Sequence, residues 1–509
     1  MNLNLLLVAK KRFCFLLGAS SLILVMGLLS DIYLGDEVYH FRFAQDIFLS
    51  GHRPFYDLLY GNPYTGAPGS LLYLSAPLWN ILLALFWKLT GGVNQWSAQL
   101  FQTLYYCALL LIIILSGKKL YGTEKIGDAG GLIVGTVPMV VSFSILFYTD
   151  VPALSLEMLT FFFLLQRKYI YSGIFLGLAV MTKLYNYFLI PTALFMIFWE
   201  EEVSWKRWLV NVLKVIIPTV LIILPDLYYR YQHFGGFFFI PDPIIGPQQE
   251  TLYFNPPLTQ AFANSSILRP INLIQYFGIT VPFLMIIYWF KKGYERRDIV
   301  LWVPIIIYGI GYTIFFRKSL DIRYLFPIIP FIVILAGKTF SMVSYRWVKT
   351  AIIFLCFLQI GGTAFYVWKE RQVPRSIQEG FDFIKKNLSS QAIILYPEEN
   401  ITYWTGRRMQ WGRMKYLPYL FWSANPEEMR EILEINAVDY ILIKKSRIYD
   451  DQRVRHKGGY PRSFVEKLPQ ISFLRIIFEN EDLALWEIER KSFSYGKIHG
   501  IFHKRGLGD

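Results

Sequence analysis

The sequence predicts an all-α, polytopic membrane protein with a small α/β domain at its C-terminal end. Hydrophobic residues make up 54% of the 509 positions and charged residues only 17%, whereas a soluble domain needs about 25% charge to cover its surface. Apolar runs long enough to cross a hydrocarbon core of about 30 Å recur as far as Trp368. The aromatic content of 18% is typical of a chain with many membrane–water interfaces.

The net charge of +14 does not indicate a nucleic-acid-binding protein. Most of the clustered basic residues form short runs beside apolar segments, where such runs set the topology of a membrane protein. The three cysteines all lie in apolar stretches and imply no disulfide framework. The basic runs are Lys10-Lys11-Arg12, Lys118-Lys119, Arg167-Lys168, Lys291-Lys292 and Arg296-Arg297.

About eleven transmembrane helices are predicted. The first follows a basic run directly, and no small-residue cleavage motif precedes the next acidic residues, so we interpret it as a retained helix with a cytoplasmic N-terminus. The predicted spans start near Phe13, Ala98, Ile126, Val151, Tyr169, Leu184, Trp208, Ile271, Ile299, Tyr324 and Val348.

The apolar run 70–87 is interpreted as an interfacial or re-entrant segment. If it crossed the membrane, every later basic cluster would fall on the side that the positive-inside rule disfavours. Its short length and the prolines Pro68 and Pro77 also make it the weakest candidate span. With this choice, residues 35–69, the turn 148–150, the loop 226–270 and everything after Trp368 lie outside the cytoplasm.

Residues 1–370 therefore form a predicted transmembrane domain, and residues 371–509 a predicted extracytoplasmic α/β domain. In this second domain the pattern predicts helices over 377–388 and 426–436 and strands over 392–396 and 440–444. Segments 473–479 and 483–488 are predicted to form a terminal hairpin.

Two acidic sites lie on the predicted outer face. Asp36 and Glu37 follow the first span, and residues 37–49 have helical apolar spacing that predicts an amphipathic helix on the membrane surface. A carboxylate held there is partly desolvated and suits a general base, although acids at a membrane margin also simply end helices. Asp150 is the second acid, and it is equally interpreted as a helix-capping residue before Val151 and Pro152.

Cations are predicted on the same face. Lys183 interrupts an apolar stretch, either as a functional cation or as a lysine that extends to the membrane surface. Arg317, Arg323 and Tyr324 belong to a polar cluster between two later spans, where basic residues run against the positive-inside trend. An anionic ligand, such as a lipid-linked phosphate, explains why basic residues occur on this face.

At these residues the sequence resembles the GT-C glycosyltransferases, which use polyisoprenyl-phosphate sugars. Segments 35–40 and 323–327 resemble the protein mannosyltransferase and aminoarabinose transferase branch. Residues 36–37 and 148–150 are also similar to dolichyl-phosphate-glucose glucosyltransferases. Segment 177–183 adds to the resemblance, which spans about residues 31–330. No Trp-Trp-Asp motif occurs, so the oligosaccharyltransferase branch is disfavoured.

The resemblance implies roles for individual residues. Either Asp36 or Glu37 would be the base that activates the acceptor hydroxyl, with Asp150 assisting it, in a single displacement that inverts the anomeric centre. The phosphate and donor would be bound by Lys183, Arg317, Arg323 and Tyr324, and the acceptor or its loop by His40, Arg53 and Tyr148. No cofactor is expected, and metal dependence is left open.

The sequence thus predicts a multi-pass plasma-membrane (inner-membrane) glycosyltransferase of the cell envelope. Its partners would be a polyisoprenyl-phosphate sugar donor, a lipid, glycan or protein acceptor, and membrane lipids, with no nucleic acid. The alternative is a multi-spanning transporter or lipid flippase. Such proteins usually carry charges near mid-membrane and repeated halves, whereas the candidate acids and cations of this chain lie at the margins of the predicted spans.

Overall fold

The computed structural model describes residues 3–32, 35–49, 77–200, 205–234, 270–291, 294–315, 322–398, 400–410, 420–421, 423–450 and 459–489. The chain divides into two compact units, of which the first ends at Gln372 and the second begins at Val373. The described residues of the first unit contain helices and no strand. The boundary predicted from the sequence lies at residue 370.

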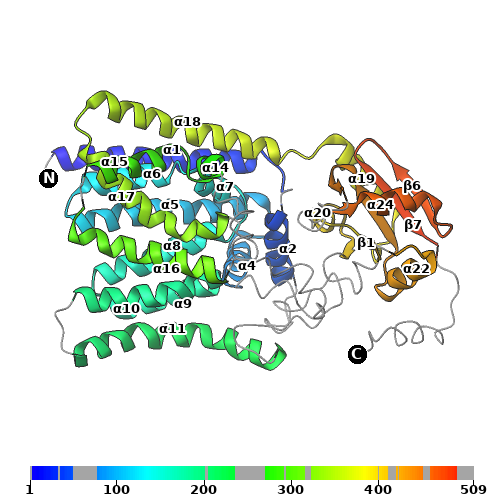
Figure 1. Cartoon of the computed structure of the whole chain (residues 1–509), viewed down its shortest axis with the longest axis horizontal. Coiled ribbons are helices and arrows are strands. Elements are labelled where there is room, and N and C mark those ends of the chain that lie inside the picture. Colours follow the sequence, from blue (N-terminus) through cyan, green and yellow to red (C-terminus); the bar gives the residue numbers. More distant parts are fainter. Residues whose placement is uncertain are drawn as a thin grey trace. The chain divides into compact units, whose positions relative to one another are not determined.

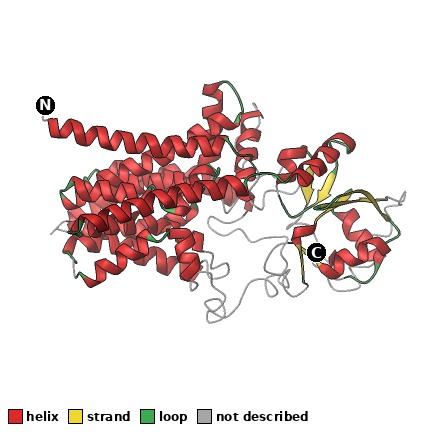
Figure 2. Ribbon diagram, turned by 90° about the horizontal axis from the view of Figure 1, so that it is seen from above, coloured by secondary structure: helices red, strands yellow, loops and turns green. Residues whose placement is uncertain are grey.

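The first unit is a bundle of helices that run side by side (Figures 1 and 2). Its α-helices are α1 (Leu3–Leu28), α2 (Gly35–Leu49), α4 (Leu78–Thr90), α5 (Gln95–Tyr121), α6 (Glu124–Val134), α7 (Pro138–Ile145), α8 (Asp150–Leu165), α9 (Tyr169–Thr182), α10 (Leu189–Glu200), α11 (Trp205–Phe234), α14 (Pro270–Phe277), α15 (Thr280–Phe290), α16 (Ile299–Phe315), α17 (Ile329–Met342) and α18 (Arg346–Glu370). Short 3₁₀ helices are η1 (Leu184–Phe188), η3 (Arg296–Asp298) and η4 (Ile322–Ile328).

Helices occupy the segments in which the predicted spans begin, but the count of eleven crossings is not confirmed. Among the described residues four helices are long and apolar enough to cross a membrane, or five if the α6–α7 pair, bent by 61°, is one span. Other apolar segments are interrupted. Gly278, for example, has φ = 74° and separates α14 from α15, since this backbone region favours glycine.

Helix α11 corrects one predicted boundary. The sequence places the start of the outer loop at Asp226, whereas α11 continues to Phe234. Pro218 and Pro225 lie inside this helix without ending it. Prolines are tolerated in membrane helices where neighbouring groups satisfy the freed backbone carbonyls. The rest of the predicted loop, residues 235–269, lies outside the described part of the chain.

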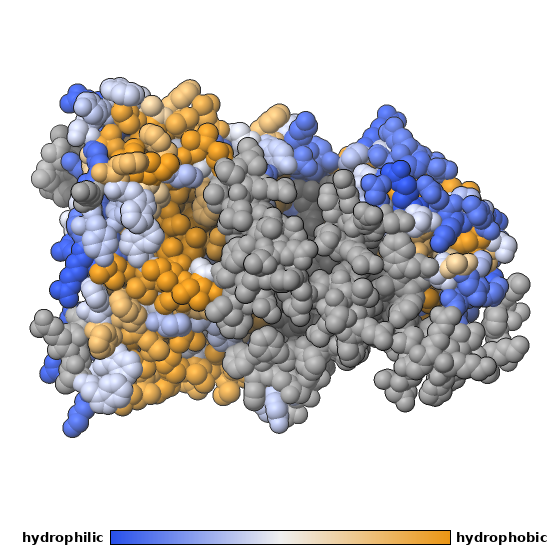
Figure 3. Space-filling view, in the orientation of Figure 1, coloured by the Kyte–Doolittle hydropathy of each residue, from blue (hydrophilic) through white to orange (hydrophobic). Residues whose placement is uncertain are grey.

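The two ends of the bundle differ in chemistry. At one end Arg12 of α1 forms ion pairs with Glu124 and Asp128 of α6, at 2.8 and 2.6 Å. At the other end α2 and α4 run across the ends of the long helices (Figure 1). Between these ends the visible side of the bundle is largely apolar, as Figure 3 shows. This arrangement suits a bundle that crosses a bilayer, with α2 and α4 at one margin.

Helix α2 agrees with the amphipathic helix predicted over 37–49. Val38, Phe41 and Ala44, which the sequence pattern places on its apolar face, are all buried. Helix α4 occupies part of the run 70–87 and has 13 residues, which span about 20 Å, less than a hydrocarbon core. The prediction that this run does not cross the membrane stays a prediction, because residues 70–76 lie outside the described chain.

The second unit contains a five-stranded mixed sheet of order β2-β1-β3-β7-β6. Strands β1 (Ile393–Leu395), β2 (Arg408–Gln410) and β3 (Tyr440–Lys444) are parallel, while β7 (Leu483–Ile488) is antiparallel to both β3 and β6 (Leu474–Glu479). A second, two-stranded sheet joins β4 (Ile448–Tyr449) and β5 (Tyr460–Pro461). The accompanying helices are α19 (Arg375–Asn387), α20 (Asn400–Thr405), α22 (Pro426–Ile435), η5 (Lys445–Arg447), α24 (Arg462–Lys467) and η6 (Leu468–Gln470).

Candidate active site

Asp150 and Lys183 form an ion pair at one end of the bundle. The Lys183 Nζ lies 2.5 Å from Asp150 Oδ2, and the two side chains are 21% and 3% exposed. Asp150 is the first residue of α8, and the N-cap residue Thr149 makes no side-chain capping bond. The Asp150 carboxylate thus pairs with Lys183 and also lies in the first turn of the helix, where an acidic side chain is favourable.

A break in the helical path places Lys183 at this position. Lys183 ends α9 with an extended backbone (φ −155°, ψ 125°), and η1 begins at the next residue. The Asn186 side chain closes the end of α9, because its Nδ2 donates to the Ala179 carbonyl at 2.9 Å. The ammonium also lies 5.6 Å from the centre of the Tyr185 ring, at a distance where cation–π attraction operates. Lys183 is thus held at the edge of the apolar interior.

Glu37 and Arg371 form a second, fully buried ion pair. Arg371 Nη2 lies 3.1 Å from Glu37 Oε2, and neither side chain is exposed. Arg371 Nη1 donates to Ser30 Oγ at 2.8 Å and to the main-chain carbonyls of Gly27 and Ile145 at 3.3 and 3.4 Å. One guanidinium therefore connects the end of α1, the start of α2, the end of α7 and the end of α18.

The turn that precedes Asp150 lies between the two pairs. Phe147 in this turn lies beneath the Arg371 guanidinium, 5.7 Å away, and its ring is 5.6 Å from that of Phe41 on α2. Gln102 Nε2 donates to the Tyr148 carbonyl at 2.9 Å. The structure thus brings Glu37, Asp150 and Lys183 to the same end of the bundle.

Two further predicted residues lie close by. His40 is buried on α2 and packs edge-on against Trp79 of α4, with ring centres 5.7 Å apart. Tyr148 stacks on Phe143 at 4.8 Å, and Phe143 also packs against Phe326 of η4 at 5.2 Å. This second contact brings η4, whose backbone carries Arg323 and Tyr324, to the same end of the bundle.

The remaining predicted positions are described only in part. The backbones of Asp36, Arg323 and Tyr324 belong to α2 and η4, but their side chains lie outside the described part of the structure. Arg317 and Arg53 lie entirely outside it. Their roles stay predictions.

Sequence reasoning missed Arg371. This residue follows Lys369 and Glu370 at the end of a span, where charged residues are normally solvated, and no local feature distinguishes it from its neighbours. Sequence reasoning also missed Glu157, a fully buried acid on α8. The sequence did contain a signal for Glu157, because an acidic residue inside an apolar run indicates a functional role by default.

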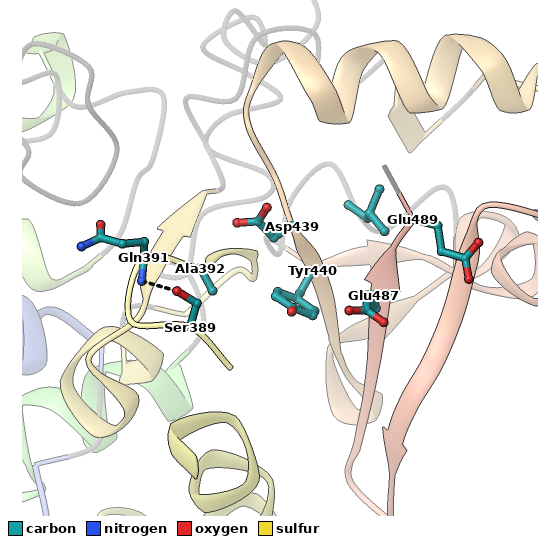
Figure 4. Close-up of a pocket in the computed structure, with 8 residues that line it drawn as sticks. Ser389, Gln391, Ala392, Asp439, Tyr440, Glu487 and Glu489 are labelled. Carbon is teal, nitrogen blue, oxygen red and sulfur yellow. Dashed lines mark hydrogen bonds between the residues drawn. The ribbon is translucent and has the colours of Figure 1, made fainter. Parts of the chain in front are cut away.

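The second unit has a pocket of its own, of about 540 Å³. It lies at the amino ends of β1 and β3, with Asp439, Tyr440 and Glu487 among its lining residues (Figure 4). In sheets with parallel strands, ligands bind beyond the carboxyl ends of the strands. This pocket lies at the opposite ends of these strands.

No group of three His, Cys, Asp or Glu side chains is placed to hold a metal ion within the described ranges. The expectation that no cofactor is needed stays a prediction. Every candidate residue above can act through charge, hydrogen bonding or proton transfer.

Comparisons with known proteins identify the fold. The family model for dolichyl-phosphate-mannose-protein mannosyltransferase matches residues 75–229. The structure of ArnT from Cupriavidus metallidurans bound to undecaprenyl phosphate is similar over 94% of this chain and 98% of that one, with a TM-score of 0.65 and 13% identity. No curated protein matches this chain in sequence.

Two other transferases share the fold. The archaeal oligosaccharyltransferase AglB from Archaeoglobus fulgidus, in complex with an inhibitory peptide and a dolichol-phosphate, is similar over 85% of this chain and 70% of that one, with a TM-score of 0.60 and 11% identity. The arabinofuranosyltransferase AftD from Mycobacteria is similar over 94% and 42%, with a TM-score of 0.52 and 11% identity. The chain therefore has the fold of the GT-C glycosyltransferases, and the resemblance predicted from the sequence is confirmed.

Proposed function

We propose that this multi-pass membrane protein is a glycosyltransferase that moves a sugar from a polyprenyl-phosphate donor to a hydroxyl acceptor outside the cytoplasm. The observation that carries the proposal is the Asp150–Lys183 pair beside the Glu37–Arg371 pair, at one end of a bundle with the GT-C fold. Acids and cations together at a membrane margin suit a reaction between a hydroxyl and an anionic lipid headgroup.

Asp36 is the base in this proposal, and Glu37 is its structural neighbour. Glu37 is fully buried and its carboxylate faces Arg371, so it is not accessible to an acceptor hydroxyl. Asp36 takes the proton of the acceptor hydroxyl while the acceptor oxygen bonds to the anomeric carbon. The bond from that carbon to the phosphate oxygen breaks, and polyprenyl phosphate leaves with the electron pair. Attack opposite the leaving group inverts the anomeric centre.

Lys183 binds the leaving phosphate in this scheme. An ammonium has three N–H donors, so contact with Asp150 leaves donors for phosphate oxygens. Arg317, Arg323 and Tyr324 complete the donor site, and His40, Arg53 and Tyr148 line the approach of the acceptor.

The choice of donor is supported by what two proteins of the same fold bind. ArnT is bound to undecaprenyl phosphate and AglB to a dolichol-phosphate. A lipid phosphate places its headgroup at the membrane margin, and this proposal assigns the two ion pairs to that margin. The sugar and the acceptor are left open, because the likeness is one of fold.

Mass spectrometry of glycolipids and glycoproteins in a deletion strain tests the proposal. Loss of one sugar modification, restored by the wild-type gene but not by Asp150→Asn at equal expression, is the expected result. An unchanged glycan profile contradicts the proposal. Accumulation of a lipid-linked sugar on one leaflet, with transfer intact in permeabilised cells, would support a flippase instead.

A further inference from the structure

A buried acid lies beneath the candidate site and has no role in the scheme above. Glu157 stands two helical turns after Asp150 on α8, about 10 Å further along the axis, and is fully buried. No described lysine or arginine forms an ion pair with it, and neither carboxyl oxygen makes a hydrogen bond of good geometry to a described residue. Acids kept inside a membrane bundle at such a cost usually serve a function.

The neighbours of Glu157 are two tyrosines that reach it from other segments. Glu157 interacts electrostatically with Tyr308 of α16 and with Tyr185 of η1, and the rings of these two tyrosines pack edge-on with centres 6.5 Å apart. Both tyrosines are buried. Buried polar side chains from three segments therefore lie in this region: Glu157 of α8, Tyr308 of α16, and Tyr185 and Asn186 of η1.

Tyr308 also contacts η1 directly. Its hydroxyl donates to Asn186 Oδ1 at 3.2 Å, and its ring packs edge-on against Phe188 at 6.0 Å and Tyr185 at 6.5 Å. Asn186 in turn closes the end of α9. The break that carries Lys183 is thus tied to α16 through Tyr308, and the Phe188 ring also lies against Gly311 of the same helix.

We propose that Glu157 and Tyr308 are positioning residues that fix the helix break at Lys183 and so set the affinity of the site for a lipid phosphate headgroup. This inference rests on the proposed function. A lysine side chain has considerable rotamer freedom, so its contribution to binding depends on how well its backbone is held before the ligand arrives. Asp150 pairs directly with the Lys183 ammonium, and the centre of the Tyr185 ring lies 5.6 Å from it.

Binding of undecaprenyl phosphate to the full-length protein in nanodiscs tests this inference. Tyr308→Phe removes one oxygen, and Glu157→Leu removes the carboxyl at similar volume. Each is expected to weaken binding about tenfold and to raise the donor KM to the same degree, with kcat at saturating donor within about twofold of wild type. Glu157→Gln keeps a polar group of the same shape, so it is expected to retain wild-type binding.

Tyr106→Phe is the matched control. Tyr106 is also buried and donates to a main-chain carbonyl, that of Gly135, at 2.7 Å, and this partner lies at the end of α6 rather than in η1. Its variant should lose stability without a change in lipid binding or donor KM. Equal losses in Tyr106→Phe and Tyr308→Phe would overturn the inference, as would wild-type binding in Tyr308→Phe.

The outcomes also separate this inference from the proposed function. If the wild-type protein binds undecaprenyl phosphate but transfers no sugar, the proposed function fails while the binding comparison still decides the role of Tyr308. If the wild-type protein transfers sugar and Tyr308→Phe has a wild-type donor KM, only the positioning role is wrong.

Discussion

Arg371 satisfies several buried groups at once. Its guanidinium faces Glu37 and donates to Ser30 Oγ and to two main-chain carbonyls, with no exposure to solvent. Desolvating such a pair is costly, and removing one partner leaves the other charge buried. The pair therefore specifies where α2 begins, and with it the position of Asp36.

Single substitutions of this pair should be more harmful than their combination. Arg371→Met and Glu37→Gln are each expected to destabilise the protein by about 3–5 kcal/mol. The double variant should lose clearly less than the sum, because no uncompensated charge then remains. Thermal unfolding of the purified variants checks this, and strictly additive losses would contradict a direct interaction.

Part of this site was predictable from the sequence. Asp150 and Lys183 stand out because each interrupts apolar residues in a predicted membrane segment, and the structure pairs them. Which partner an acid takes depends on the packing of helices distant in the chain. Glu37 and Arg371 are more than 300 positions apart, so no local pattern predicts their contact.

Close packing of α5 and α6 depends on particular glycines. A Cβ added at Gly127 would lie 2.2 Å from the Ile114 carbonyl oxygen, a backbone atom that cannot move freely. At Gly130 of the same helix the nearest atom would be 3.4 Å away, which is ordinary contact. Comparing alanine substitutions at Gly127 and Gly130 therefore separates the cost of steric overlap from the gain in helix propensity.

Gly127→Ala is expected to destabilise the bundle through overpacking, by about 1–3 kcal/mol or more. Gly130→Ala should be neutral or stabilising by up to about 1 kcal/mol, because alanine favours the helix. Melting temperatures of the two purified variants compare them directly. Equal effects would show that the close approach of α5 and α6 is not a constraint.

An ion cluster connects β1 and β3 in the second unit. Glu398 lies 2.9 Å from Lys444 Nζ and 2.7 Å from Arg447 Nε. Burial alone would raise the pKa of the Glu398 carboxyl, but the two cations together hold that pKa below its ordinary value of 4.5. A carboxylate with a depressed folded-state pKa stabilises the fold above its unfolded pKa, and this contribution is lost as the pH falls through the folded value.

Hydrogen exchange in the full-length protein should report this linkage. Protection of β1 and β3, corrected for intrinsic exchange, is expected to fall progressively below about pH 4.5. Glu398→Gln should lower the free energy of exchange of β1 and β3 at pH 7 by about 1–3 kcal/mol. Protection in this variant should also fall less steeply as the pH is lowered. A decline of the same size in the variant would show that other acids cause it.

Elements were more predictable than their connections. The length of apolar runs located the helical segments of the bundle, and the strand predicted over 440–444 and the hairpin strand over 483–488 are confirmed with those bounds. Strand β2 was not predicted, because its three residues are too few for a recognisable pattern. Nor did the sequence predict that β7 would lie between β3 and β6, because strand order is set by tertiary packing.

The number of membrane crossings is also hard to predict from the sequence alone. Hydropathy detects apolar length, but Lys183 and Gly278 break apolar segments into shorter helices. Whether two such pieces make one crossing depends on neighbours that satisfy the backbone at the break. The side chains of Asn186 and Gln359 do so in this bundle.

At the scale of the whole molecule, sidedness is the main open prediction. Arg12 and Lys118 mark one end of the bundle, and the two ion pairs of the candidate site mark the other. The positive-inside rule assigns the basic end to the cytoplasm. On this assignment the candidate site is predicted to face away from the cytoplasm.

Cysteine labelling in spheroplasts checks this topology. In a variant without native cysteines, Ser389→Cys in the second unit should react with a membrane-impermeant maleimide from outside. Lys119→Cys at the end of α5 should react only after permeabilisation. Both residues are exposed, and the reverse pattern would place the site in the cytoplasm.

Sugar transfer by the purified protein tests the central claim most directly. With an undecaprenyl-phosphate sugar and its acceptor, wild-type protein should release undecaprenyl phosphate, and Asp36→Asn should reduce kcat by about 10²–10⁴-fold, the usual contribution of a general base. Asp31→Asn, a nearby acid with no proposed role, should remain within about twofold of wild type. Undiminished transfer by Asp36→Asn would contradict the account.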